Sequence, residues 1–475
     1  MSIRRLGLSS LLLLSVSACS LIPDYHRPDS SVAPTWPAGP AGQSAGAIGG
    51  ATAGDLGWSQ FFTDPVAQDL IRLALENNRN LRVAALNVQS AEAQYGVDRA
   101  SLFPAIDANA GYEASKTPGD TVGTTGQQNV REYSLGAEAL SWELDLFGAI
   151  RSKAKSAKET AFANEQTAIG TQLTLEAEVV SEYLAWLADR QSLAVAQDTV
   201  KSEADSVRLT QLLLANGTDT ALDEAQAEVT LRTAQASVAQ YQRAVAEDMD
   251  ELVLLVGAPI PGDVEQRMEA VNFLSDEPTF PALSAGVPSD LLARRPDIRA
   301  AEHTLLAANA NVGAARAAFF PSITLTASGG RASSALNNLF GAGQGSWLFE
   351  PQVSVPIFNA GSNFANLDIA KVEKRVEIAD YQETIQTAFH DVSDALVSRD
   401  TYADQIAAQQ ALVAADQKNY DLSSMRFKAG IDAYLTVLVA EESLFSAKLN
   451  LIALQLSEQQ NLVTLYKALG GGWKS

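Results

Sequence analysis

Residues 173–194 read LTLEAEVVSEYLAWLADRQSLA, and the apolar spacing in this stretch reveals the architecture of the chain. Apolar side chains recur every seven residues and again between these positions, at Leu173, Val180, Leu187 and Ala194 and at Ala177 and Leu184. A seven-residue apolar repeat predicts a helix that packs in a coiled-coil-like manner. Good helix formers extend on both sides. We therefore predict one helix from Gly148 to Ala215, roughly 70 residues and ~100 Å long.

Turn signals divide this helical region and a second one near the C-terminus. No proline occurs between Pro118 and Pro259 or after Pro356, so both regions favour long helices. Asn216-Gly217 and Ala429-Gly430 interrupt them, and we predict that these glycines form the turns of two helical hairpins. Helices of this length suit a tunnel that crosses a compartment better than they suit a globular domain.

Several segments of the chain occur twice in the same order. Arg82, Gly96 and Phe103-Pro104 match Arg299, Gly313 and Phe320-Pro321 at one offset. The later matches join Leu146-Phe147-Gly148 to Ile357-Phe358-Asn359, Asn216-Gly217-Thr218-Asp219 to Ala429-Gly430-Ile431-Asp432, and Leu255-Val256-Gly257 to Ala468-Leu469-Gly470. We therefore predict an internal duplication.

Two pairs of strands are predicted from apolar residues that alternate with polar ones. Their first strands cover 106–113 and 322–328, and their returning strands cover 133–145 and 347–356. The apolar parity shifts between Ala139 and Leu140, which predicts a β-bulge. Alternating segments joined by loops rich in Gly, Thr and Ser are typical of membrane β-barrels, although a soluble sandwich hairpin has the same pattern.

The strands also bear on how the chain meets a membrane. No run of eighteen apolar residues occurs, so the sequence predicts no transmembrane helix. A membrane-crossing sheet must then close into a barrel, because an open edge would leave backbone groups unpaired in lipid. The four strands predicted for a single chain are too few to close a barrel. We therefore predict oligomerisation, and the spacing alone does not choose between two chains and three.

The N-terminus has the features of an export signal. Arg4 and Arg5 precede an apolar run from Leu6 to Val16, about half the ~20 residues of a membrane-spanning helix. Val16-Ser17-Ala18-Cys19 resembles a bacterial lipobox, which implies cleavage before Cys19 and lipid attachment to it. A plain signal peptide that contains a cysteine is the alternative. Ser20 is not an aspartate, which in such lipoproteins favours sorting to the outer membrane.

Composition and motif spacing argue against several function classes. The formal net charge of -22 argues against nucleic-acid binding. His26, His303 and His390 are far apart and lack metal-ligand spacing. We find no combination of nucleophile, base and orienting group. We therefore predict no enzyme, no catalytic residue, no metal and no cofactor, apart from a covalent lipid on Cys19.

Three segments resemble one known family. They are Trp58-x-x-Phe61-x-x-Asp64-Pro65, the run GVPSDLLARRPDIRAAE from Gly286 to Glu302, and the ending LYKALGGGW from Leu465 to Trp473. Together they are similar, over nearly the whole mature chain, to the TolC-like outer-membrane efflux lipoprotein family. These proteins are the outer-membrane factors of resistance-nodulation-division tripartite pumps.

The resemblance implies a mixed α and β membrane protein that assembles as a homotrimer. Its chains are expected to form a twelve-stranded transmembrane β-barrel that continues into an α-barrel of long antiparallel helical hairpins. The location implied is the cell outer membrane, lipid-anchored and in contact with its lipid, with a periplasmic extension. The partners implied are a periplasmic adaptor protein and an inner-membrane pump. The expected function is a passive exit channel for drugs or other small molecules.

Acidic residues cluster around both hairpin turns, at Asp219, Asp223, Glu224 and Glu228 and at Asp432, Glu441 and Glu442. In a trimer, each inward-facing carboxylate becomes a ring of three, and such rings select for cations or narrow a pore. The resemblance places a periplasmic gate here, with Asp219, Asp223, Asp432, Val439 and Glu441 as candidate gate or selectivity residues. Relatives often carry Asp at the position that matches Val439, so the gate is either hydrophobic there or charged through Asp432 and Glu441. A solvated acidic helix face is the alternative.

We divide the chain into five segments: a signal peptide at 1–18, a lipid anchor and tether at 19–55, a first structural repeat at 56–260, a connecting equatorial segment at 261–295, and a second repeat at 296–475. Two other functions remain open. A protein-secretion exit channel has the same architecture. A periplasmic coiled-coil adaptor has one long hairpin between lipoyl-like halves, whereas this sequence predicts two hairpins and two strand pairs.

Overall fold

The computed structural model describes residues 20–29, 32–33, 35–36, 51–117, 128–218, 220–271, 280–284 and 288–471. The predicted signal peptide, the lipidation residue Cys19, and the gate candidate Asp219 lie outside these residues. The chain divides into two compact units. We call them the strand unit, formed by Met1–Asp29, Asn87–Asn164 and Ala300–Tyr381, and the helical unit, formed by Ser30–Leu86, Glu165–Arg299 and Gln382–Ser475.

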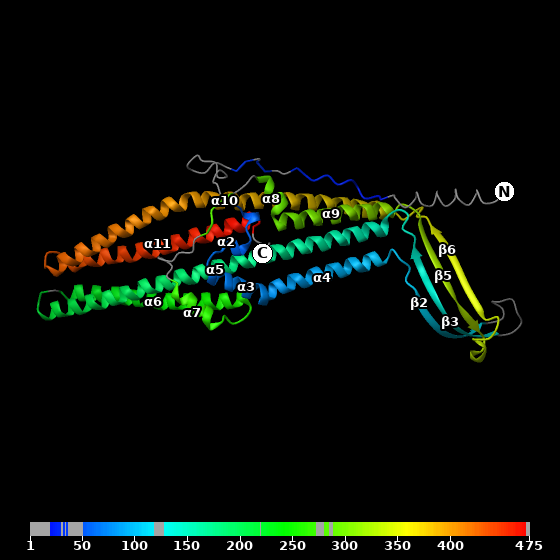
Figure 1. Cartoon of the computed structure of the whole chain (residues 1–475), viewed down its shortest axis with the longest axis horizontal. Helices are drawn as coiled ribbons and strands as arrows, with labels where there is room; N and C mark the ends of the chain where they lie inside the picture. The colour runs from blue at the N-terminus through cyan, green and yellow to red at the C-terminus, as the bar shows by residue number, and fades with distance from the viewer. Residues whose placement is uncertain are drawn as a thin grey trace. The chain divides into compact units, whose positions relative to one another are not determined.

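The strand unit contains a four-stranded antiparallel sheet. Its order is β2 (Asp107–Thr117), β3 (Gln128–Glu143), β5 (Ser322–Ser333) and β6 (Gly345–Ser354), as Figure 1 shows. The four strands that alternation predicted are therefore confirmed. β2 and β6 lie at the two ends of the order, so each pairs with a single strand within the part of the chain that is described.

One face of this sheet is apolar and the other is polar. Facing pairs on the apolar side follow from the register: Tyr112 with Tyr133, Ala110 with Leu135, Trp142 with Leu325, Ala327 with Phe349, and Gly329 with Trp347. Pairs on the opposite side include Glu113 with Glu132 and Thr326 with Glu350. Trp347 is 81% exposed, so the apolar face has little cover from its own chain.

The predicted bulge is confirmed at Ala139–Trp142, where the pairing of β3 with β5 shifts by one residue. Ala139 faces Ala327 and Trp142 faces Leu325, so two residues of β3 oppose the single residue Thr326. The bulged Ser141 has a positive φ of 48°. The extra residue explains the shift in apolar parity, because it returns Trp142 to the apolar face.

Helices and strands follow one another in the same order twice. The first series is α4 (Arg79–Ala100), β2, β3, α5 (Ala149–Ala215) and α6 (Ala221–Val256). The second is α9 (Pro296–Ala317), β5, β6, α10 (Ser362–Lys428) and α11 (Tyr434–Ala468). α5 and α10 each contain 67 residues, and the bounds of α5 confirm the helix predicted from Gly148 to Ala215.

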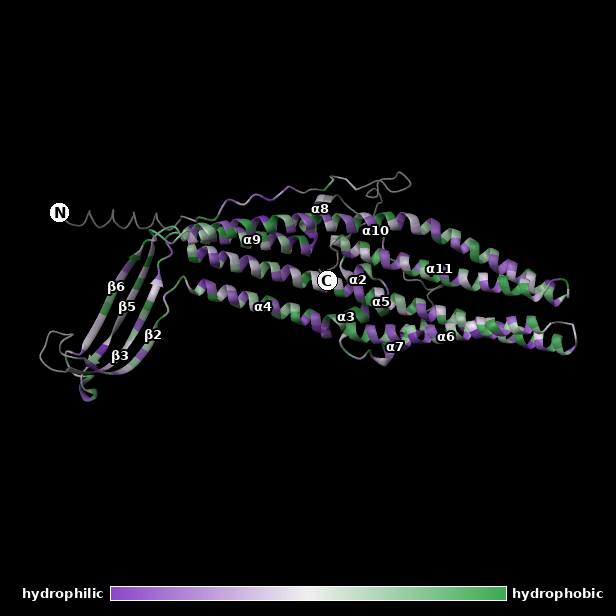
Figure 2. Cartoon of the chain, turned by 180° about the vertical axis from the view of Figure 1, so that it is seen from behind, coloured by the Kyte–Doolittle hydropathy of each residue, from purple (hydrophilic) through white to green (hydrophobic). Residues whose placement is uncertain are grey.

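Figure 2 shows hydrophilic and hydrophobic residues interspersed along the long helices. Among the described residues, no helix combines the length and the apolar character that crossing a membrane requires.

The seven-residue apolar repeat predicted for α5 is confirmed at its first three positions and wrong at its last. Leu173, Val180 and Leu187 are buried, whereas Ala194 is exposed. The next buried alanine is Ala196, two residues later and about 200° around the helix from Ala194, so a different face of α5 is buried from this point.

Shorter elements form the core of the helical unit. They are α2 (Trp58–Phe61), α3 (Pro65–Asn77), α7 (Gly262–Ala270), α8 (Pro288–Arg294), the 3₁₀ turn Ala53–Asp55, and a parallel strand pair of β1 (Ala51–Thr52) with β4 (Leu283–Ser284). The Phe61 ring stacks on Tyr466 of α11 with 4.1 Å between centroids. The Tyr466 hydroxyl donates to the carbonyl oxygen of Leu56 at 2.9 Å. This aromatic packing joins the start of the first repeat to the end of the second.

The arginine-rich motif before α9 is structural. Pro296 is the first residue of α9, where its missing N–H costs no hydrogen bond. The Arg295 guanidinium forms ion pairs with Asp297 at 2.6 Å and Asp391 at 3.3 Å, and it also donates to the carbonyl oxygen of Ala468. Arg295 therefore holds α9, α10 and the end of α11 together.

Candidate functional site

The candidate site is the end of the helical unit where both hairpins turn (Figure 1). Gly217 and Gly430 each have φ +72°, a left-handed conformation that glycine adopts without strain. Thr218 N donates to Leu213 O and Gly217 N donates to Leu214 O, which is the Schellman pattern. Ile431 and Gly430 make the equivalent bonds to Arg426 and Phe427. The predicted turns are confirmed, and both use the same backbone chemistry.

The two hairpins pack against each other near these turns. Ala227 of α6 shares a buried cluster with Tyr434 and Val437 of α11, and partly buried side chains surround it: Val207, Tyr420, Phe427 and Leu438. The Ser202 and Tyr420 hydroxyls are 3.0 Å apart, which joins α5 to α10 through a hydrogen bond. The residues at the tips are therefore positioned by contacts within a single chain.

Asp223 caps the start of α6. Its backbone N–H donates to the Thr220 hydroxyl at 3.3 Å, and its carboxylate accepts from the Thr220 backbone N–H at 3.3 Å. This reciprocal arrangement is a capping box, and a carboxylate in the first turn also interacts favourably with the helix dipole. Asp223 thus has a structural role at the tip, and its role in a pore stays a prediction.

Asp432 forms an ion pair just beyond the second turn. The Arg426 guanidinium of α10 donates to both of its carboxylate oxygens, at 2.5 and 2.8 Å. These hydrogen bonds lower the pKa of the Asp432 carboxyl, so it remains ionised at neutral pH. Val439 is 54% exposed on α11, so its side chain is available to a surface or a lumen.

Glu441 lies elsewhere, between the hairpins. It is only 6% exposed, and Glu203 of α5 beside it is fully buried. The Tyr434 hydroxyl donates to a Glu203 carboxylate oxygen at 3.4 Å. Glu203 Oε1 and Glu441 Oε2 are buried, and no N–H or hydroxyl group of the described residues donates to either atom. The predicted acidic residues therefore do not form one group: Asp223 and Asp432 are partly exposed at the tips, whereas Glu441 is buried against Glu203.

The buried pair retains a proton at neutral pH. Burial, followed by the charge of Glu441 and a hydrogen bond with it, raises the pKa of Glu203 to about 8. Burial also raises the pKa of Glu441, although hydrogen bonds with Ser202 and Glu203 oppose this effect. A neutral carboxyl costs less to bury than a carboxylate, so one shared proton stabilises the packed hairpins.

Glu203, Tyr434, Tyr420 and Ser202 were missed by the sequence analysis. A signal for Glu203 exists, because it lies seven residues after buried Ala196 and seven before buried Thr210. A second seven-residue repeat that begins at Ala196 would therefore have placed a carboxyl among the buried positions of α5. Within the described residues, no group of three or more His, Cys, Asp or Glu side chains is arranged to hold a metal ion.

Comparisons with known proteins agree on one family. The family model described as "Outer membrane efflux protein" matches residues 70–258 and 287–471, which is most of the chain. The chain belongs to the outer membrane efflux protein family.

Relatives within this family match over nearly their full length. The chain is 46% identical over 470 residues to the probable efflux pump outer membrane protein TtgC of Pseudomonas putida, covering 98% of this chain and 96% of the relative. It is 38% identical over 466 residues to the cation efflux system protein CusC of Escherichia coli, with 97% of both chains covered.

Solved structures of membrane proteins show the same fold. A membrane protein from Pseudomonas aeruginosa superposes with a TM-score of 0.88 at 35% identity, covering 95% of this chain and all of the other. The open state of the Neisseria gonorrhoeae MtrE outer membrane channel superposes with a TM-score of 0.85 at 35% identity, covering 96% and 99%. This family member is thus an outer-membrane exit channel of an efflux pump, with a periplasmic extension, and the resemblance seen in the sequence is confirmed.

The buried carboxyl pair predicts a pH dependence at the tips. The pKa of Glu203 is raised in the folded state, so its stabilising contribution is complete below pH 4.5 and is lost as the pH rises through about 8. Each unit of raised pKa costs about 1.4 kcal/mol once the carboxyl is ionised. We expect hydrogen exchange in the tip helices, corrected for intrinsic rates, to show less protection at pH 9 than at pH 6.

Glu203→Gln keeps the size of the side chain and removes its titrating proton. The variant should therefore lose much less hydrogen-exchange protection between pH 6 and pH 9. Glu228→Gln, on the exposed face of α6, is the matched control and should behave as the unsubstituted protein. Equal protection at both pH values in the unsubstituted protein would contradict the prediction.

Proposed function

We propose that three copies of this chain form one duct, in which the strand units close a twelve-stranded β-barrel and the helical units form an α-barrel of hairpins. The observation that carries this proposal is the sheet of the strand unit, which has two end strands and an exposed apolar face. Lipid offers no hydrogen bonds to backbone groups, so β2 and β6 each require a partner strand from another copy. The two equivalent series of helices and strands support an internal duplication as the origin of the chain.

We further propose that the hairpin tips form the periplasmic gate. The acidic candidates are Asp219, Asp223, Asp432 and Glu441, with Val439 as an apolar candidate on α11. Three-fold assembly would turn each inward-facing side chain into a ring, and rings of carboxylates favour cations. The burial of Glu441 within its own chain favours Asp432 and Val439 for contact with the lumen.

A periplasmic adaptor protein and an inner-membrane pump are the proposed partners, and Cys19 is the proposed site of lipid attachment. The cargo proposed is small organic molecules. Relatives at 46% identity carry the names toluene efflux pump outer membrane protein TtgC and antibiotic efflux pump outer membrane protein ArpC. A cation efflux system protein is less similar at 38%. The duct is proposed to conduct passively, with the driving force supplied by its partners.

The number of chains is tested by membrane fractionation followed by mass determination in detergent. We expect an outer-membrane complex with three times the mass of the mature chain, and an added acyl mass on each chain. Cys19→Ala should remove the acyl mass and leave the three-chain complex. A monomer or a dimer would contradict the proposed duct.

The orientation of the sheet is tested by two neighbouring residues of β6. Phe349 lies on the apolar face and Glu350 on the polar one. A lipid-facing arginine near the middle of a membrane costs about 2–4 kcal/mol in a barrel. We expect Phe349→Arg to lower the amount of folded trimer in the outer membrane, measured by its resistance to protease. Glu350→Arg is the control, and an equal loss in both variants would contradict the assignment of faces.

The gate is tested in planar bilayers. Asp432→Ala removes the ion pair with Arg426, so we expect a several-fold rise in single-channel conductance of the closed protein. Asp223→Ala should have the same direction of effect, because it removes the cap of α6. Asp421→Ala, an exposed acid further along α10, is the control. Unchanged conductance in both tip variants would count against a gate at this level.

A further inference from the structure

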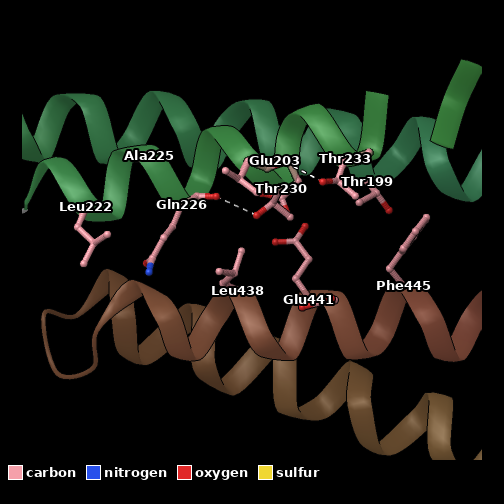
Figure 3. A pocket seen from close by; sticks show the side chains of 13 residues that line it. Thr199, Glu203, Leu222, Ala225, Gln226, Thr230, Thr233, Leu438, Glu441 and Phe445 are labelled. Atoms are coloured by element: carbon pink, nitrogen blue, oxygen red, sulfur yellow. Dashed lines mark hydrogen bonds between the residues drawn. The ribbon is translucent and has the colours of Figure 1, made fainter. Parts of the chain in front are cut away.

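A cavity of about 400 Å³ lies between the hairpins, next to the buried carboxyl pair. Figure 3 shows its lining side chains, which come from α5 and α6 on one side and α11 on the other. This volume falls within the range of ligand-binding pockets, which are ~300–1,000 Å³. The cavity therefore has room for a small organic molecule rather than only for water.

The walls of the cavity are largely apolar. Leu222 and Val229 contribute from α6, and Leu438 and Phe445 from α11 (Figure 3 labels three of these four). Leu222 and Val229 are about two-thirds exposed in the chain, so the apolar wall is open to a molecule that approaches from outside. An apolar body bound here would bury these side chains and gain hydrophobic free energy.

The polar groups at one end of the cavity are acidic. Glu203 and Glu441 line it, and no N–H or hydroxyl group of the described residues donates to the buried atoms Glu203 Oε1 and Glu441 Oε2. No lysine or arginine is among the residues that line the cavity in the described part of the chain. Once the proton of the pair is lost, two carboxylates beside an apolar wall attract a cationic donor strongly, because none of the residues that line the cavity carries a positive charge.

The combination of an apolar wall and an acidic end points to one class of ligand. A bare metal ion would satisfy the carboxylates and leave the apolar wall unused. A neutral hydrocarbon would bury the wall and leave the carboxyl oxygens unpaired. A molecule with an apolar ring system and a primary ammonium group satisfies both.

We propose that this cavity binds an amphipathic organic cation, with its ammonium group between Glu203 and Glu441 and its apolar body against Leu222, Val229, Leu438 and Phe445. The site lies within one chain, so three are present in the proposed trimer. Its occupation replaces the shared proton of the carboxyl pair with the charge of the ligand, and it bridges α6 to α11. The inference concerns a binding site between the hairpins and does not depend on conduction through the duct.

The experiment uses the full-length protein in a non-ionic detergent and isothermal titration calorimetry. The probe is 1-naphthylmethylamine, which carries an ammonium group on an apolar ring system, and the matched neutral probe is 1-naphthylmethanol. At pH 8.5 we expect one amine bound per chain, with the alcohol at least ten-fold weaker. Calcium chloride alone tests whether the carboxyl pair takes a metal ion instead.

Three variants locate the site. Glu441→Gln removes one carboxylate and should weaken amine binding at least ten-fold. Ala225→Phe fills the exposed side of the cavity while both carboxyls remain, and it should also weaken binding. Glu228→Gln removes one exposed charge from α6 outside the cavity and should leave the affinity unchanged.

Affinity should also fall about ten-fold at pH 6, because the carboxyl pair is then protonated. The titratable groups that face the pair are Glu442, Tyr434 and Tyr420, from α11 and α10, and none of them supplies a positive charge.

Equal binding of the amine and the alcohol would overturn the proposal. So would amine binding that survives Glu441→Gln, calcium binding in place of the amine, or no amine binding at millimolar concentration. Each of these results is distinct from a failure to form the trimer.

Discussion

The constraint on which this structure depends is the need to pair the backbone groups at the two ends of the sheet. In a soluble protein, water would hydrogen-bond to the free edges of β2 and β6. The apolar face that includes Tyr112, Leu135 and Trp347 indicates a lipid environment, where water does not supply these bonds. In the proposed trimer, symmetric association would satisfy these edges by pairing the end strand β6 of one copy with β2 of the next. Assembly of the proposed duct is thus a requirement of strand pairing rather than an addition to a folded monomer.

The helical unit meets a different requirement, because its helices must pack along great length without a large apolar core. Small side chains such as Ala177 and Ala227 allow close packing, and aromatic contacts such as Phe61 with Tyr466 fix the ends of the two repeats. Near the tips this seam includes Glu203 and Glu441, which are the least suitable residues for a dry interface. The proton that Glu203 retains at neutral pH lowers the cost of burying the pair, and it makes the packing of the tips responsive to pH.

Much of the fold could be predicted from the sequence, because the relevant signals are local. Alternation in 106–113 and 322–328, the glycine turns at 217 and 430, and the absence of proline each specify backbone conformation within a few residues. The bulge at Ala139–Trp142 was visible as a change of parity. The seven-residue repeat failed at Ala194 because a different face of α5 is buried there, and the buried residues continue at Ala196, Glu203 and Thr210.

The candidate site was less predictable, because burial near the tips depends on contacts between distant helices. Asp223, Asp432 and Glu441 look alike as acids near a turn, yet one caps a helix, one pairs with Arg426, and one is buried against Glu203. Glu203 is more than 200 residues from Glu441 in the sequence, so the residues near either one do not predict that the two carboxyls meet. Which residues line the lumen depends on the neighbouring copies, which the sequence of one chain does not specify.

The bulge in β3 has a consequence for how this sheet tolerates changes in length. Two residues, Leu140 and Ser141, oppose the single residue Thr326, so the loss of either would leave a regular ladder with Trp142 still opposite Leu325. A one-residue deletion at the same level of β5 would instead reverse the faces of every position up to the next turn. Sequences that share this sheet can therefore gain or lose a residue at this point of β3 without exchanging their apolar and polar faces. Alignment gaps should accumulate there and be absent from the strand beside it.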